Sequence, residues 1–258
     1  MSIAITEAAR RHTLSVDVVF RPSELTTDRI FEKSVVVFDV LRATTSITAA
    51  LAAGVSEIRV FKDTPSAAEA GRSFGKAALL CGEITCLRPP GFDLGNSPGD
   101  FKRELHADRI AFLSTTNGTK AIIAAREAAT VLIGALVNAT AIAQELISIG
   151  RNVTLLCAGT QGNYSMEDVI GAGAVIDALL VKEAATPMGD AARMAHRLFQ
   201  SARSNLRESL SDTTSGGNLR AAYLETDIEF CARLDSIPVV GIIRDYPLRV
   251  INSAIATK

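Results

Sequence analysis

The chain lacks the features that mark several large classes of protein. Its four cysteines, Cys81, Cys86, Cys157 and Cys231, form no CxxC pair and lie among apolar or small residues. This pattern favours buried, reduced thiols over a disulfide framework. The formal net charge is only −1 over 258 residues, so no nucleic acid and no charged membrane surface is expected as a partner. The expected partner is a small molecule.

Long apolar runs are also missing. No stretch reaches the roughly 18 consecutive apolar residues that a membrane-spanning helix needs. The first twenty residues contain basic side chains but no apolar core of the kind that follows them in a signal peptide. We therefore expect a cytoplasmic protein with no membrane segment.

Three familiar catalytic motifs are absent. Gly75-Lys76 has Ala70 where a Walker A loop needs its first glycine, and Ala77 follows in place of serine or threonine. None of the cysteines has an arginine six residues later, as a cysteine phosphatase loop would require. The three histidines form no H-E-x-x-H pattern, so each is expected to be an ordinary histidine.

What the chain does contain is a regular alternation of apolar runs with alanine-rich amphipathic segments. Short β-branched runs followed by helical patterns of about 10 to 15 residues indicate βαβ units. We predict an α/β fold of largely parallel or mixed sheets flanked by helices, with two lobes near 1–130 and 131–258 in a single unit. The expected strands lie in 34–40, 57–61, 77–83, 109–114, 130–136 and 152–159.

Two strand–turn–helix units resemble each other: FDVLRATTSITAAL and LSTTNGTKAIIAA both pass from an apolar strand through a polar turn into an Ala/Ile-rich helix. The similarity fits an internal repeat, and it also fits the general likeness of any two such units. In either case we expect the two turns to face each other across a binding site.

The C-terminal third has a different amino-acid composition. Residues 181–218 are polar and Ala/Arg-rich, which predicts one or two helices followed by a mobile loop at SDTTSGGN. The segment IPVVGIIRDYP predicts a last strand, and Pro238 and Pro247 on either side of it favour a position near an edge of the sheet.

Polar side chains gather where the predicted strands end. In parallel sheets, ligands bind at the carboxyl ends of the strands, where helix N-termini favour anions. The residues there combine anion-binding groups with carboxylates and include no histidine, a set that suits a phosphate together with Mg²⁺. Two threonines, Thr44 and Thr119, have helix N-caps as their alternative reading, and so does Asp168.

A proline- and glycine-rich loop spans residues 88–101. A loop of this length with fixed turns and with Asn96 and Ser97 near its tip predicts a lid or a substrate contact. The alternative is an ordinary surface loop.

Taken together, several motifs resemble the 2-phosphosulfolactate phosphatase (ComB) family. They are DVLRATTS, CGE, GFDLGNSP, TTNGT, CAGTQGNYSMEDVIGAGAV, SGGNL and DIEFCARLDSIPVVG, and they occur in one order between Val35 and Gly241. The resemblance implies lobes around a cleft and Mg²⁺-dependent hydrolysis of a small phosphorylated hydroxy acid. In the family the named reaction yields (R)-3-sulfolactate and phosphate, a step toward coenzyme M.

The resemblance places the family's motif positions on most of the polar residues of the predicted site. Thr45 and Thr115 are added from the ends of the predicted strands, and the individual roles are our inference. We predict catalytic roles for Asp39, Arg42 and Glu83, and metal binding by two or three of Asp39, Glu83, Glu167 and Asp168. The predicted substrate-binding residues are Arg42, Thr44, Thr45, Asn96, Ser97, Thr115, Thr116, Asn117, Gly118 and Thr119.

Alternatives stay open at this point. We expect water activated at the metal to be the nucleophile; an aspartyl-phosphate is the other option, although Leu41 occupies the second position of the D-x-D pair found in haloacid-dehalogenase phosphatases. The substrate could instead be a related phospho-hydroxycarboxylate. From a different class, the chain could be a non-catalytic binder of a small anionic metabolite. A homodimer is compatible with the sequence.

Overall fold

The computed structural model describes residues 13–256. The prediction that the first twenty residues are not a signal peptide therefore lies largely outside the described residues. The protein is built on a ten-stranded mixed sheet in the order β4-β5-β3-β10-β9-β6-β2-β7-β1-β8. The strands are β1 (Leu14–Val19), β2 (Ser34–Phe38), β3 (Glu57–Val60), β4 (Ala78–Gly82), β5 (Ile110–Ser114), β6 (Thr130–Gly134), β7 (Val153–Cys157), β8 (Ala185–Pro187), β9 (Gly241–Arg244) and β10 (Arg249–Asn252). The predicted α/β class is confirmed.

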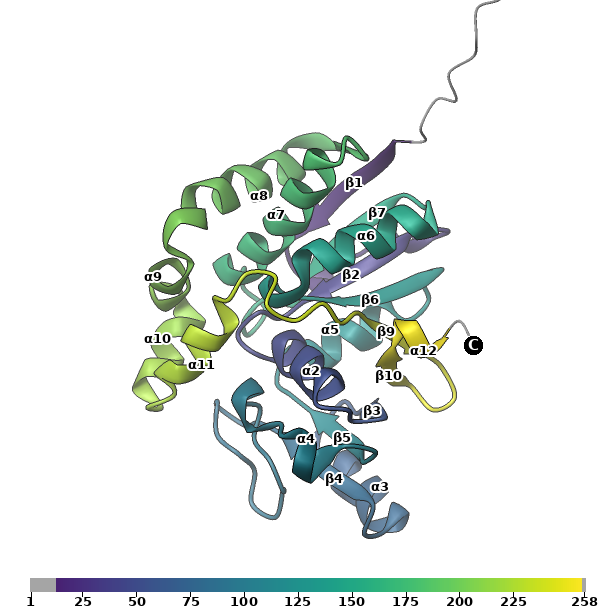
Figure 1. The fold of residues 1–258 in the computed structure, drawn as a ribbon, viewed down its shortest axis with the longest axis vertical. Coiled ribbons are helices and arrows are strands. Elements are labelled where there is room, and N and C mark those ends of the chain that lie inside the picture. The colour runs from purple at the N-terminus through teal and green to yellow at the C-terminus, as the bar shows by residue number, and fades with distance from the viewer. Residues whose placement is uncertain (1–12, 257–258) are drawn as a thin grey trace, which may run out of the picture.

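Helices flank this sheet (Figure 1). They are α1 (Thr27–Ile30), α2 (Ala43–Ala52), α3 (Thr64–Phe74), α4 (Arg103–His106), α5 (Gly118–Ala125), α6 (Ala139–Ile149), α7 (Met166–Val181), α8 (Gly189–Ala202), α9 (Leu206–Ser211), α10 (Thr214–Ala221), α11 (Glu225–Cys231) and α12 (Ser253–Ala256). Short 3₁₀ turns lie at Pro22–Glu24, Pro98–Asp100, Leu136–Asn138 and Arg203–Asn205.

The sheet consists of two parallel blocks joined by an antiparallel hairpin. Strands β4, β5 and β3 are parallel to one another, as are β6, β2, β7, β1 and β8. The β9–β10 hairpin between the blocks pairs antiparallel with β6 on one side and β3 on the other. Three successive antiparallel pairings mean that the two blocks run in opposite directions. The predicted lobe boundary near residue 130 stays a prediction, and both predicted lobes contribute strands to this one sheet.

Strand β2 is buried on both faces, as its sequence SVVVF requires for an interior parallel strand. Val36 and Phe38 pack into a core formed with α6 to α11, whereas Val35 and Val37 pack into a second core with α2 and α5. The turn that follows β2 is therefore held between two helical layers.

The C-terminal strand does not lie near an edge, so that prediction is wrong. β9 is an interior strand between β6 and β10. Pro238 precedes the strand, and Pro247 lies in the turn between β9 and β10, so neither proline occupies a position that must donate to the ladder. Strand β1 was not predicted.

The stretch SDTTSGGN is largely helical rather than a loop. The Thr213 hydroxyl caps α10 by accepting from the Gly216 N–H at 3.0 Å. A Cβ at Gly216 would lie 2.2 Å from the Leu210 carbonyl oxygen, so the glycine permits close packing of α10 on α9. The glycines that suggested a loop serve helix packing.

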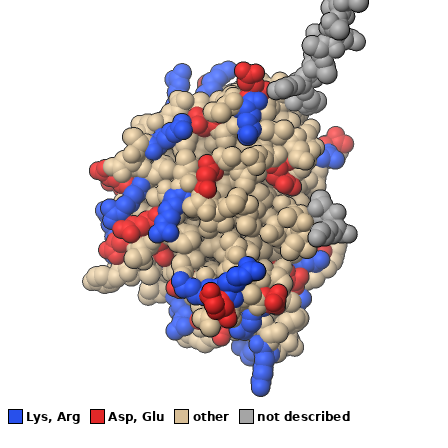
Figure 2. Space-filling view, viewed as in Figure 1, with Lys and Arg blue, Asp and Glu red and all other residues tan. Residues whose placement is uncertain are grey.

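Three of the cysteines are buried, Cys86 is half-buried, and all four are free thiols, as expected. None of the helices within residues 13–256 is long and apolar enough to cross a bilayer. On the face drawn in Figure 2, basic and acidic side chains are interspersed.

Candidate active site

A polar cleft lies where the two blocks of the sheet meet. It encloses about 590 Å³, including the space open to solvent at its mouth. Its walls come from the segments that follow β2, β4, β5 and β7, and from α10. The lining residues are Asp39, Leu41, Arg42, Glu83, Thr85, Cys86, Asn96, Thr116, Asn117, Thr160, Gln161, Ser215, Asn218 and Leu219.

The turn between β2 and α2 is closed by its own side chains. One Asp39 carboxylate oxygen accepts from the Ala43 N–H at 3.0 Å. The Thr44 hydroxyl accepts from the Asp39 N–H at 3.0 Å and donates to the Asp39 carbonyl oxygen at 2.9 Å. Thr45 donates to the Val40 carbonyl oxygen. Thr44 therefore builds the turn and does not cap the helix.

The turn between β5 and α5 uses the same bonding scheme. The Thr115 hydroxyl accepts from the Thr119 N–H at 3.1 Å, as Asp39 does from Ala43. The Thr119 hydroxyl accepts from the Thr115 N–H at 3.3 Å and donates to the Thr115 carbonyl oxygen at 2.9 Å. The two look-alike sequence units thus form look-alike turns.

These two turns face each other, as predicted. A Cβ built at Gly118 would lie 2.6 Å from Asp39 Oδ2 and 2.5 Å from the Ala43 Cβ. Gly118 is required here by close approach, since any side chain would separate the turns. The contact brings the ends of β2 and β5 together although the strands belong to opposite blocks.

Asp39 is only 9 % exposed, and burial raises the pKa of its carboxyl from 3.8 to about 7. The negative charges of Glu83 and Glu167 add to the increase, while the hydrogen bond from Ala43 opposes it. The raised pKa therefore reflects mainly the burial of Asp39, and the nearby carboxylates add to it.

Glu167 and Asp168 are adjacent at the start of α7, and each is 2 % exposed, yet their environments differ. The two oxygens of Asp168 accept from the Val40 N–H at 2.8 Å and the Gly159 N–H at 3.1 Å, so Asp168 ties together the turns after β2 and β7. It does not cap its own helix. Burial beside Glu167 and Asp39 raises the pKa of Asp168. No hydrogen-bond donor among residues 13–256 contacts the Glu167 carboxylate.

Glu83 joins two walls of the cleft. Its carboxylate accepts from the Thr116 N–H at 2.6 Å and from the Cys86 N–H at 3.0 Å. It therefore fixes the second turn against the segment that follows β4.

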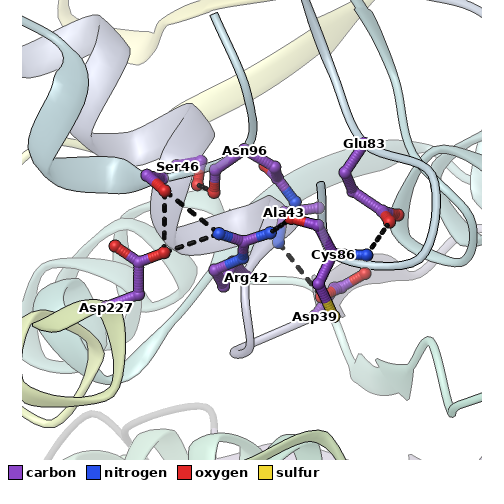
Figure 3. A network of polar contacts seen from close by, with 9 residues as sticks. Asp39, Arg42, Ala43, Ser46, Glu83, Cys86, Asn96 and Asp227 are labelled. Atoms are coloured by element: carbon purple, nitrogen blue, oxygen red, sulfur yellow. Dashed lines mark hydrogen bonds and ion pairs between the residues drawn. The ribbon is translucent and has the colours of Figure 1, made fainter. Parts of the chain in front are cut away.

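Arg42 is the cation of the cleft lining, and it is 3 % exposed and ion-paired. Its Nη1 lies 2.5 Å from Asp227 Oδ2 and donates to Ser97 Oγ at 3.1 Å. Its Nη2 donates to the Cys86 carbonyl oxygen at 2.6 Å. Figure 3 shows Arg42 in the middle of this network, with Asp227 on one side and Cys86, Asp39 and Glu83 on the other.

The loop at 88–101 is attached to the edge strand β4. Asp93 accepts from the Leu80 N–H at 2.8 Å, and the Leu94 N–H donates to the Leu80 carbonyl oxygen at 3.0 Å. The Ser46 hydroxyl holds the Asn96 carbonyl oxygen at 2.6 Å. The buried Asn96 amide oxygen has no partner within the described residues. The loop is thus a fixed wall that presents a free amide.

The predicted site residues fall into two groups. Asp39, Arg42, Glu83, Asn96, Thr116 and Asn117 line the cleft, whereas Thr44, Thr45, Ser97, Thr115, Gly118, Thr119, Glu167 and Asp168 do not. The threonine hydroxyls of the second group are used in the turns, so the structure gives them a positioning role. Direct contact of the second group with a ligand stays a prediction.

Sequence reasoning missed several residues in or beside the cleft. The most important is Asp227, which lies outside the lining and pairs with Arg42 across 185 positions of sequence. Ser215 and Gln161 were also missed: Ser215 bonds to Thr160, and the Gln161 N–H donates to the Asn117 side chain at 3.2 Å. Asp227 and Ser215 lie in DIEFCARLDSIPVVG and SGGNL, so those motifs were the available signal.

The residues present fit Mg²⁺ in one specific way. Within residues 13–256 no three carboxylate, imidazole or thiol groups are placed to hold a metal by themselves. Asp39 and Glu167 are nevertheless buried residues, and within residues 13–256 no hydrogen bond engages Asp39 Oδ2 or the Glu167 carboxylate. In addition to burial, both carboxylates raise the pKa of their common neighbour Asp168. Two carboxylates completed by water and substrate phosphate are an ordinary set for Mg²⁺. Asp168 and Glu83 already use both oxygens on backbone N–H groups.

Comparison with known proteins gives relatives over most of the chain. A sequence model of the family described as 2-phosphosulpholactate phosphatase matches residues 19–246. Three similar relatives are each named probable 2-phosphosulfolactate phosphatase. The protein from Carboxydothermus hydrogenoformans is 38 % identical over 228 residues, covering 88 % of this chain and 92 % of the relative. The protein from Thermotoga petrophila is 34 % identical over 239 residues (90 % and 100 %). The protein from Clostridium tetani is 33 % identical over 227 residues (88 % and 96 %).

These names agree with the prediction of a phosphoric monoester hydrolase, and the match extends over both blocks of the sheet and every segment that lines the cleft. The chain therefore belongs to the 2-phosphosulfolactate phosphatase family.

Proposed function

We propose that this protein hydrolyses the phosphate monoester of a small hydroxy acid with Mg²⁺ as cofactor. The substrate proposed first is (2R)-O-phospho-3-sulfolactate, which would give (R)-3-sulfolactate and phosphate, because the relatives are named for this reaction. A related phospho-hydroxycarboxylate is the alternative substrate.

The charge balance of the cleft is the observation that carries the proposal. Its lining contains Asp39 and Glu83 against Arg42, and Arg42 is already paired with Asp227. Such a cleft would repel a phosphorylated acid, whose phosphate and acid groups are all negative. A divalent cation held by Asp39 and Glu167 would reverse the local charge, and it would supply the electrostatic stabilisation that phosphoryl transfer needs.

The chain's own residues position the substrate. The start of α5 points its positive dipole end toward the proposed phosphate position, and Thr116 and Asn117 line the cleft beside it. Glu83 and Asp168 hold the surrounding turns in place. We propose that water attacks the phosphorus in line with the leaving hydroxyl oxygen, since Asp39 has Leu41 rather than a second aspartate two residues later.

A non-catalytic binder of an anionic metabolite is disfavoured by the same charges. An anion receptor gains affinity from lysine and arginine, whereas this cleft concentrates carboxylates around Asp39. In an enzyme, such carboxylates would bind a divalent cation, and the cation would bind the substrate phosphate.

The test is phosphate release from a panel of esters that includes 2-phosphosulfolactate, 2-phospholactate and phosphoglycolate. With Mg²⁺ we expect turnover of at least one of them and loss of turnover in EDTA. Absence of release across the whole panel would refute the enzyme assignment. A hydroxylamine-sensitive phosphoenzyme would instead refute attack by water.

A further inference from the structure

Asp227 lies outside the lining of the cleft and is connected to it through Arg42. It lies on α11, is 4 % exposed, and places one oxygen, Oδ2, against both Arg42 and Ser97. The Ser97 hydroxyl donates to Asp227 at 2.8 Å and accepts from Arg42 at 3.1 Å. Three segments far apart in sequence thus converge on one guanidinium (Figure 3).

The guanidinium is held on both of its terminal nitrogens. Nη1 faces Asp227 and Ser97, and Nη2 faces the Cys86 carbonyl oxygen. Arg42 also lines the cleft, and two of its five N–H donors are not used by Asp227, Ser97 or the Cys86 carbonyl oxygen. An unpaired arginine side chain would lose conformational entropy when it binds a ligand. Because its hydrogen bonds already hold Arg42 in one conformation, ligand binding has a smaller entropy cost.

The pairing also changes what Arg42 can recognise. Asp227 offsets the charge of the guanidinium through a buried ion pair of 2.5 Å. A neutralised guanidinium offers directional hydrogen bonds with little net charge. That suits a singly charged oxyanion, carboxylate or sulfonate, more than a doubly charged phosphate, which gains most from a cation.

We propose that Asp227 is a positioning residue that acts through Arg42, and that the Arg42–Asp227–Ser97 unit recognises the acid group of the substrate rather than its phosphate. This inference rests on the proposed function, since it assigns the two ends of a phosphorylated hydroxy acid to different parts of the cleft. The Arg42–Asp227–Ser97 unit would thus make the enzyme prefer phosphate esters that also have a carboxylate or sulfonate group.

The experiment compares Asp227→Asn with wild type on three phosphate esters of secondary alcohols. Isopropyl phosphate has no acid, 2-phospholactate has a carboxylate, and the phosphate ester of 2-hydroxypropane-1-sulfonate has a sulfonate. Asparagine keeps the shape of Asp227 but not its charge. Glu229→Gln is the matched control, because Glu229 is on the same helix and pairs with Arg207 at an exposed position.

We expect Asp227→Asn to lower the preference for at least one acid-bearing ester over isopropyl phosphate by tenfold or more, chiefly through KM. Whichever acid loses its advantage identifies the group that Arg42 holds. Ser97→Ala should shift the same preference less, and Glu229→Gln should not shift it. An equal loss on all three esters would show a merely structural role, and a lower KM for acid-bearing esters would show that Asp227 competes with substrate; either result overturns the proposal.

Binding separates this inference from the proposed function. Calorimetry with lactate, with 2-hydroxypropane-1-sulfonate and with inorganic phosphate needs no turnover. We expect Asp227→Asn to weaken binding of an acid tenfold or more and to leave phosphate binding within about twofold. If wild type hydrolyses none of the esters but shows this pattern, the proposed function fails and the inference stands. If neither acid binds to wild type, or if binding of acid and phosphate weakens equally in the variant, the inference fails.

Discussion

Gly118 lies so close to Asp39 that a Cβ at position 118 would be 2.6 Å from the Asp39 Oδ2 atom. This contact joins the turns after β2 and β5, which come from oppositely directed blocks of the sheet. It places the start of α5, the proposed phosphate site, directly beside the carboxylate proposed to hold the metal. The turn after β2 and the turn after β5 can therefore approach this closely only because residue 118 is a glycine.

Gly118→Ala tests this relationship. The added methyl group must push Asp39 or Ala43 away, and misplacement by about 1 Å can lower a rate on the order of 100-fold. We expect kcat/KM for the best substrate to fall by about that factor. Gly99→Ala is the control, since a Cβ there meets nothing within 4 Å. Equal activity of the two variants would mean that the turns are not held at a critical distance.

The pH dependence of stability tests the buried charge at Asp39. The pKa of this carboxyl is raised from 3.8 to about 7 on folding, so between these values the unfolded chain has lost the proton that the folded chain keeps. The contribution of Asp39 to folding is therefore greatest below about pH 4 and is lost as the pH rises to about 7. In EDTA we expect wild type to become less stable than Asp39→Asn between pH 5 and pH 8, by on the order of a few kcal/mol.

Urea unfolding of both proteins at the two pH values gives this difference directly. Added Mg²⁺ should restore stability to wild type at pH 8 and should have little effect on Asp39→Asn. Parallel pH profiles for the two proteins would contradict the raised pKa.

The neighbours Glu167 and Asp168 should respond differently to the same chemical change. Asp168→Asn removes an acceptor from Val40 or Gly159, whose N–H groups are buried, so the free energy of unfolding should fall by about 1–3 kcal/mol. Glu167→Gln breaks no hydrogen bond within the described residues. It should leave stability in EDTA unchanged or higher and raise the Mg²⁺ concentration for half-maximal activity tenfold or more. If both variants lose stability without any change in Mg²⁺ requirement, the division of roles between them is wrong.

The local elements could be predicted because their signals are local. The apolar runs at β2 to β7 and the alanine-rich helices α2, α5 and α6 follow from periodicity, and MEDVIGAGAVIDALLV coincides with α7. The strand order could not be predicted, because the insertion of β9 and β10 between the blocks depends on tertiary pairing. Glycine and proline misled at Gly216 and Pro247, where they serve close packing and a hairpin turn.

The site shows the same division. Residues at the ends of predicted strands, such as Asp39 and Asn117, were identified because parallel strands place ligands there. Asp227 was missed because its partner Arg42 is 185 positions away, and the motif DIEFCARLDSIPVVG does not by itself show which of its residues reaches the site. The threonines of the turns were predicted to meet the ligand directly. The structure uses the hydroxyls of Thr44, Thr45, Thr115 and Thr119 to close the turns, and their contact with a ligand stays a prediction.

Phosphate release from 2-phosphosulfolactate, measured with Mg²⁺ titration on wild type and Asp39→Asn, tests the central claim most directly. Asparagine can keep the hydrogen bond from Ala43, so the variant should fold. We predict Mg²⁺-dependent release by wild type that EDTA abolishes, and at least a 100-fold lower rate for Asp39→Asn at any Mg²⁺ concentration. Release that persists in EDTA, or an equal rate for the folded variant, would contradict a Mg²⁺-dependent phosphatase site at Asp39.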